Sequence, residues 1–364
     1  MQADSILAPL AAVAAMHTDT RLQLIHDWLT DDLSLERFTL SPASADASFR
    51  RYFRVTTPRR SLIVMDAPPD KEDVAPFLHV RALLADCEVH VPQVYAQQPE
   101  QGFLLLEDLG DTSLLAALEK PRADPEPLYV DALTALAHIQ LRGQRAMHEL
   151  PEYDEAVLRR EMALLPEWFC TRHLQLPLGD AQRELIAGAE DFLVRQIAQI
   201  PQVLVHRDYH SRNLMITPTR SPGIIDFQDA LRGPVTYDVV SLLKDCYVQW
   251  PRRRIEDWVS ELRKQLRKRA GLASPLCASN EVEYLRWLDL VGLQRHMKVL
   301  GIFARLFWRD GKRGYLKDLP RTLDYVIDAA WRFSELRGFA QFAEQVLLPR
   351  LPAANAFAFE ARLE

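Results

Sequence analysis

Two hydrophobic patterns follow one another along the chain. Between residues 38 and 107 the apolar residues form short runs, rich in aromatic and β-branched side chains and separated by turn residues, which is typical of β-strands. A short amphipathic helix at 18–29 should precede these runs, and a helix at 72–86 should interrupt them. The predicted strands are 38–40, 52–55, 62–65, 93–96 and 103–106.

After about residue 110 the apolar residues recur with the period of an α-helix. Strands followed by a mostly helical remainder predict an α+β chain with two lobes: a small five-stranded antiparallel N-terminal lobe at 1–107 and a large helical C-terminal lobe at 108–364. The longest helix has an apolar stripe, which is typical of a core helix. The predicted helices are 112–119, 126–142, 154–169, 180–199, 236–249, 253–269, 281–309, 320–335 and 339–348.

The most informative motif lies in the helical half. Residues 206–213 read His-Arg-Asp-Tyr-His-Ser-Arg-Asn, and residues 224–227 read Ile-Ile-Asp-Phe. Kinase-type phosphotransferases carry H-R-D-x-x-x-x-N followed by D-F-G, and this chain has every position except the last glycine, which is Gln228. A surface loop with a capping aspartate would not require this ordered set, so the motif indicates phosphoryl transfer.

The chemistry of that reaction assigns the motif residues. One carboxylate, Asp208, should accept the proton of the attacking hydroxyl. Asn213 and Asp226 offer the oxygen ligands that Mg²⁺ prefers, so they should hold magnesium against the phosphates of ATP. The apolar residues on either side of the turn at 218–223 predict a short hairpin that joins these two ligands.

Composition narrows the possible partners. The chain has 364 residues, 48% of them hydrophobic, and a net charge of −6, so it can form about two domains and gives no reason to expect nucleic acid as a partner. The basic stretch at 252–269 is interrupted by acidic residues, as on a solvated helix face. The four cysteines are widely spaced, which indicates neither a zinc site nor a disulfide framework. We therefore expect a cytoplasmic monomer that does not contact membranes.

These motifs and the helical second half resemble the aminoglycoside phosphotransferase and choline kinase family, whose members are small-molecule kinases with a protein-kinase-like fold. The resemblance covers about residues 38–335 and implies the roles given above for the motif residues. It also implies that Asp238 braces the catalytic loop, although a first-turn carboxylate is common on any helix. Backbone groups near Glu107 and Leu109 would meet the adenine.

Two features depart from the family pattern. The third predicted strand lacks the lysine that usually holds the nucleotide phosphates, and the loop at 43–48 has no glycine. The hydroxyls of Ser44 or Ser48 could bind the phosphates together with backbone amides. The missing positive charge could come from Arg50, Arg51 or Arg54, unless these are ordinary surface charges of a strand.

The expected acceptor is a small molecule, because only twelve positions separate Asp226 from Asp238 and leave no room for a peptide platform. The segments 48–54, 158–162 and 294–315 resemble the branch of the family that phosphorylates the anomeric hydroxyl of N-acetylmuramate and N-acetylglucosamine in cell-wall recycling. Cations on the 281–309 helix would suit a carboxylate-bearing acceptor, or else form a solvated face. They are Arg295, His296, Lys298, Arg305 and Arg309.

Four residues are candidates for contact with the sugar: Glu161, Gln228, His210 and Trp168. Glu161 could equally pair within its helix, and Trp168 could equally pack in the core. Two other functions stay open at this point. One is a kinase for aminoglycosides, choline or another hydroxylated metabolite, and the other is a non-catalytic nucleotide-binding module, which the missing lysine suggests.

Overall fold

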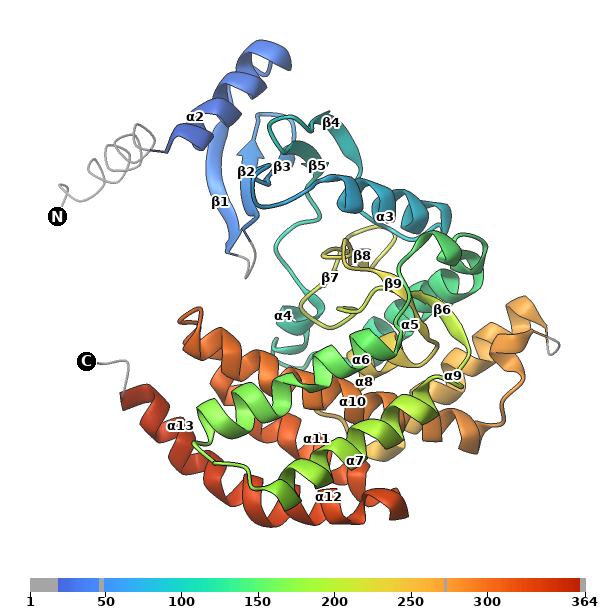
Figure 1. The fold of residues 1–364 in the computed structure, drawn as a ribbon. Coiled ribbons are helices and arrows are strands. Elements are labelled where there is room, and N and C mark those ends of the chain that lie inside the picture. Colours follow the sequence, from blue (N-terminus) through green and yellow to red (C-terminus); the bar gives the residue numbers. More distant parts are fainter. Residues whose placement is uncertain (1–18, 46–48, 272–273, 361–364) are drawn as a thin grey trace. The chain divides into compact units, whose positions relative to one another are not determined.

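The computed structural model describes residues 19–45, 49–271 and 274–360. It separates into two compact units, one formed by the chain up to residue 81 with 91–110, and the other by 82–90 with 111–364 (Figure 1). The boundary predicted after residue 107 stays a prediction. No helix among the described residues has the length and apolar character that crossing a membrane requires.

The first unit is built on an antiparallel sheet with the strand order β1-β2-β3-β5-β4. All five predicted strands are present, and the α+β fold class is confirmed. The first strand is longer than predicted, because it continues to Ala45 into the segment 43–48 that was expected to be a loop. The helix α3 (Ala75–Asp86) lies between the third and fourth strands in the sequence, also as predicted. The strands are β1 (Thr39–Ala45), β2 (Arg51–Thr56), β3 (Ser61–Asp66), β4 (Val94–Gln98) and β5 (Phe103–Glu107).

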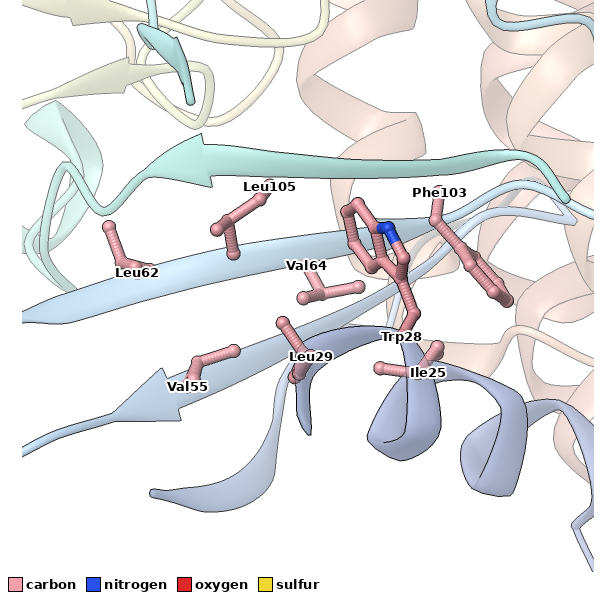
Figure 2. Packing of buried hydrophobic residues seen from close by; sticks show 8 residues of the cluster. All are labelled: Ile25, Trp28, Leu29, Val55, Leu62, Val64, Phe103 and Leu105. Atoms are coloured by element: carbon pink, nitrogen blue, oxygen red, sulfur yellow. The ribbon is translucent and has the colours of Figure 1, made fainter. Parts of the chain in front are cut away.

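The core of this unit lies between the sheet and α2 (Thr20–Asp27), which continues into a π-helical turn. Figure 2 shows Ile25, Trp28 and Leu29 pointing from the helix toward the sheet, whose alternate residues face them. The Trp28 ring lies 5.7 Å from the Phe103 ring. The sheet residues of this core are Val55, Leu62, Val64, Phe103 and Leu105.

The second unit is organised around α10 (Glu281–Trp308), which is buried over most of its length. Its neighbours include α11, α8, α7 and a π-helical segment at Leu165–His173. Gly301 allows α10 to approach the backbone at Leu164 closely, since a Cβ atom at residue 301 would lie 2.4 Å from the Leu164 carbonyl. The remaining α-helices are α4 (Leu114–Leu118), α5 (Pro125–Arg142), α6 (Glu155–Met162), α7 (Asp180–Ile197), α8 (Tyr237–Leu243), α9 (Arg252–Ala270), α11 (Leu319–Trp331), α12 (Arg337–Phe342) and α13 (Leu351–Glu360).

The predicted helix at 236–249 was wrong in its second half. The helix ends at Leu243, because Lys244 leaves the helical conformation with φ −116° and ψ 45°. Asp245 then accepts a hydrogen bond from the Tyr247 amide at 3.0 Å, which is a turn contact typical of aspartate. The residues after α8 therefore form a loop, and α13 at the C-terminal end was not predicted at all.

Short strands hold the motif loops in place. The predicted hairpin is present as β7 (Leu214–Met215) and β8 (Gly223–Ile224), which pair antiparallel. A second ladder, not predicted, pairs β6 (Gln202–Val205) with β9 (Leu231–Pro234). The loop 206–213 thus leaves one ladder and enters the other, so both of its ends are anchored.

Candidate active site

The helix α8 holds the start of the loop 206–213 through Asp238. Asp238, which is buried, accepts a hydrogen bond from the His206 amide at 2.7 Å and from the Arg207 amide at 3.0 Å. Burial raises the pKa of Asp238 to about 7, although the two amides act against this. Arg207 has a left-handed φ of +74°, an unfavourable conformation for a residue with a side chain. The two contacts to Asp238 fix the backbone immediately before Asp208.

His206 links this loop to the segment before Asp226. Its Nδ1 atom lies 3.2 Å from the Asp208 amide, and its Nε2 atom lies 3.1 Å from the Ile225 carbonyl. Nδ1 must accept and Nε2 must donate, so the ring is neutral with its proton on Nε2. Burial lowers the pKa of His206 to about 4, which agrees with a neutral ring.

Asp208 lies at a pocket in the second unit, where its side chain is 42% exposed. His210, Arg295 and Lys298 line the same pocket. Burial alone would raise the pKa of Asp208, but the charges of these three residues and of Arg207 outweigh it and lower the pKa below its usual value. The carboxylate therefore stays ionised at neutral pH and can accept a hydrogen bond from a hydroxyl.

The other walls of this pocket were missed by the sequence reasoning. Asp245, Cys246 and Tyr247 come from the loop after α8, which the sequence predicted to be helix, and Tyr315 comes from a short 3₁₀ segment after α10. Asp245 also accepts a hydrogen bond from the Ser211 amide at 3.0 Å, so it holds the backbone of the loop 206–213 as Asp238 does. The apolar wall consists of Val299, Ile302, Phe303 and Leu306.

Asn213 and Asp226 lie side by side. The Asn213 amide nitrogen donates to Asp226 Oδ2 at 3.2 Å and to the Asp208 carbonyl at 3.0 Å. Asp226 has a left-handed φ of +63°, which is uncommon for a residue with a side chain. Described residues form no cluster of three or more His, Cys, Asp or Glu side chains that could hold a metal. One carboxylate and one amide oxygen suit Mg²⁺, which commonly takes its other ligands from phosphates and water.

Gln228, a candidate for contact with the sugar, instead contacts Asp226, a candidate metal ligand. Its amide nitrogen donates to Asp226 Oδ1 at 3.0 Å, and it is not among the residues that line the Asp208 pocket. Gln228, which replaces the glycine of the D-F-G motif, thus lies beside the Asp226 carboxylate, two residues before it in the sequence. His210 does line the pocket, and its Nε2 atom lies 4.0 Å from Asp208 Oδ1.

Glu161 lies in a buried polar network. Its Oε1 atom forms ion pairs with Arg207 and with Lys298, the latter at 2.9 Å. Its Oε2 atom accepts hydrogen bonds from Tyr153 and, at 3.2 Å, from Gln294. Although burial opposes it, the two cations lower the pKa of Glu161 to about 2. Since protein groups engage both oxygens, these contacts favour a positioning role over direct contact with a sugar.

Trp168 lies elsewhere. It lines a separate hollow with Trp308 and Phe357, and the guanidinium of Arg172 lies 5.6 Å from its ring centre. Neither Trp168 nor any other residue of this hollow lines the pocket at Asp208. Stacking of Trp168 on an acceptor held at Asp208 therefore has no support from the structure.

The three arginines proposed to bind phosphate, all in the first unit, differ in their partners. Arg51 pairs with Asp19 and with the fully buried Asp66, its Nη2 atom lying 2.6 Å from Asp66 Oδ2. Arg54 forms a two-pronged contact with Asp108 at 2.7 and 3.1 Å. Carboxylates thus already neutralise these two candidates for phosphate binding. Arg50 is buried, and its predicted role stays open.

The remaining nucleotide candidates also belong to the first unit. Ser44 lies on β1, and Ser48 lies outside the described residues. Glu107 ends β5 and its amide donates to the Gln93 carbonyl at 2.8 Å, while Leu109 is buried in the connector that follows. Contact of these groups with ATP stays a prediction.

Sequence comparison identifies the family. Residues 39–274 match the family described as the phosphotransferase enzyme family. The chain belongs to this family. An N-acetylmuramate/N-acetylglucosamine kinase of Pseudomonas aeruginosa is 46% identical over 93% of this chain and 98% of its own length. Kinases with the same description from Pseudomonas putida and Neisseria meningitidis are 44% and 42% identical, over 87% and 86% of this chain and 94% and 92% of their own lengths.

Solved structures of other phosphotransferases share the fold. A choline kinase from Streptococcus pneumoniae superposes with a TM-score of 0.60 at 12% identity, covering 85% of this chain and all of that one. An ADP-bound aminoglycoside phosphotransferase has a TM-score of 0.53 at 15% identity, with 83% of this chain and 96% of that chain covered. The protein-kinase-like fold expected from the resemblance is confirmed.

Proposed function

We propose that this phosphotransferase transfers the γ-phosphoryl group of ATP to the anomeric hydroxyl of N-acetylmuramate and N-acetylglucosamine. The observation that carries the proposal is the ionised Asp208 in a pocket that also presents Arg295 and Lys298. Kinases of both sugars are up to 46% identical to this chain. We place the activity in the cytoplasm, where ATP is available, and we propose that the protein is a monomer.

In the proposed reaction Asp208 accepts the proton of the acceptor hydroxyl. The sugar oxygen forms a bond to the γ-phosphorus, the bond between that phosphorus and the β,γ-bridging oxygen breaks, and ADP leaves with the electron pair. Asn213 and Asp226 would hold Mg²⁺, which when bound offsets the negative charge of the phosphates. Asp238 and Asp245 keep the loop backbone in place, so that Asp208 needs little reorganisation during the reaction.

The acidity of the acceptor favours the anomeric position. Asp208 has a lowered pKa and is therefore a weak base. A weak base removes a proton more readily from a more acidic hydroxyl, and the anomeric hydroxyl is the most acidic one of a reducing sugar. The product would be a sugar α-1-phosphate, which a nucleotidyltransferase-type reaction could activate for cell-wall synthesis.

The charges of the pocket disfavour the other acceptors. Beside the carboxylates of Asp208 and Asp245 the pocket presents Arg295 and Lys298, so it lacks the excess of negative charge that would attract aminoglycosides and choline, which are cations. A non-catalytic nucleotide-binding module would need neither a carboxylate at the pocket, as Asp208 is, nor the contact between Asn213 and Asp226.

An acceptor panel tests the proposal. ADP release would be measured with N-acetylmuramate, N-acetylglucosamine, choline and an aminoglycoside, each at the same concentration with ATP and Mg²⁺. We expect turnover with the two amino sugars and none above background with the two cations. Turnover with choline or the aminoglycoside alone would overturn the proposed acceptor, and ADP release with none of the four would support a non-catalytic module.

A further inference from the structure

Arg295 is a buried cation with no carboxylate partner. It lies in the middle of α10 and is 4% exposed. Its hydrogen bond goes to the Cys246 sulfur at 3.9 Å, and it forms no ion pair within the part of the chain that the structure describes. Buried arginines are normally paired, because desolvating a lone charge costs free energy. The site is therefore poised for an anion that the protein itself does not supply.

The neighbouring cation on the same helix is different. Lys298 lies 2.9 Å from Glu161 Oε1 and 3.1 Å from the Tyr237 hydroxyl, so it has a direct carboxylate partner, which it shares with Arg207. Burial alone would lower the pKa of Arg295, but groups around it, including Asp208 and Asp245, raise it. Arg295 thus stays charged at any physiological pH, and of the two cations it is the one that lacks a direct partner.

The position of Arg295 indicates which anion it would meet. It lines the pocket together with Asp208 and His210, whereas Asn213 and Asp226 do not line that pocket. The phosphates of ATP belong with the metal-binding pair, so Arg295 lies on the acceptor side of Asp208. The apolar side chains of Val299 and Ile302 line the same pocket and suit a short aliphatic group next to a charge.

We propose that Arg295 binds the lactyl carboxylate of N-acetylmuramate and so determines how well the enzyme uses this sugar relative to N-acetylglucosamine. The inference rests on the proposed sugar-kinase function. A guanidinium can donate two parallel hydrogen bonds to a carboxylate, which gives both strength and orientation. N-acetylglucosamine lacks the lactyl group, so it binds through the rest of the pocket and leaves Arg295 without its partner.

The test compares the two sugars in wild type, Arg295→Gln and Arg295→Lys, with Arg286→Gln as a matched control at an exposed position of the same helix. We expect Arg295→Gln to raise the KM for N-acetylmuramate about tenfold or more and the KM for N-acetylglucosamine less than about twofold. Because Arg295 also lowers the pKa of Asp208, kcat should change by the same factor for both sugars. Arg295→Lys should recover part of the loss. An equal change of KM for both sugars would overturn the inference.

A change in the substrate tests the same claim on the unaltered protein, should the variant fail to fold. The primary amide of N-acetylmuramate keeps the shape of the lactyl group and removes its charge. Wild type should show a KM for the amide about tenfold or more above that for the acid. Equal KM values for the amide and the acid would overturn the role of Arg295 but not the proposed sugar-kinase function. Wild type that phosphorylates neither sugar would overturn the proposed function, and this inference with it.

Discussion

Replacing Asp208 by asparagine should lower turnover by about 100-fold or more while leaving the fold and ATP binding intact, because general-base catalysis contributes about 10²–10⁴-fold. Asparagine has nearly the same shape and cannot accept a proton. The loop should keep its conformation, because its backbone is held by Asp238 and by the His206 ring and not by the Asp208 side chain. Steady-state kinetics with N-acetylglucosamine, together with nucleotide binding by calorimetry, would measure both effects.

The matched control is Asp257→Asn, the same change at an exposed position of α9. It should keep wild-type kcat and KM. Asp208→Asn with near wild-type turnover would remove Asp208 from the mechanism. Loss of ATP binding in this variant would mean that the residue acts on the nucleotide and not on the acceptor.

Asp226→Ala should abolish activity. It removes the carboxylate of the proposed Mg²⁺ pair, and it also removes the acceptor of the hydrogen bonds from Asn213 and Gln228. The charge of the transferred phosphoryl group would then lose its counterion. Chelation of the wild-type enzyme should have the same effect, and added Mg²⁺ should restore activity to wild type but not to the variant.

Asp257→Ala is the control for this change and should behave as wild type. Thermal melting of Asp226→Ala would separate loss of the metal site from loss of the fold. Full turnover of the wild type in excess chelator would contradict the magnesium-dependent mechanism, whatever the variant does.

The sequence predicted the sheet because its strands are short, bounded by turn residues and rich in strand-forming side chains. It failed after α8, where apolar residues continue with helical spacing through Cys246 and Tyr247. In the structure these two residues line the pocket, so tertiary contacts override the local pattern. The helix α13 was missed because its alanines and phenylalanines are spread around the helix and show no single apolar face.

Part of the candidate site could likewise be predicted from the sequence, and part could not. Asp208, Asn213 and Asp226 lie within nineteen positions, so their spacing alone brought them into one hypothesis. Glu161 shows the opposite case, because its partners Arg207 and Lys298 are distant in the sequence and only the fold brings them together. Such pairings cannot be read from the sequence, so a carboxylate that pairs with buried cations cannot be distinguished there from a carboxylate that binds a sugar.

Phosphorylation should occur at the anomeric hydroxyl, and the methyl α-glycoside of N-acetylglucosamine is the substrate that tests this. This compound keeps the other hydroxyls and the acetamido group but has no free anomeric hydroxyl. We expect no turnover with the glycoside, and we expect phosphorus NMR of the product from the free sugar to show a phosphate coupled to the anomeric proton. Phosphorylation of the glycoside at a rate similar to that of the free sugar would contradict the account.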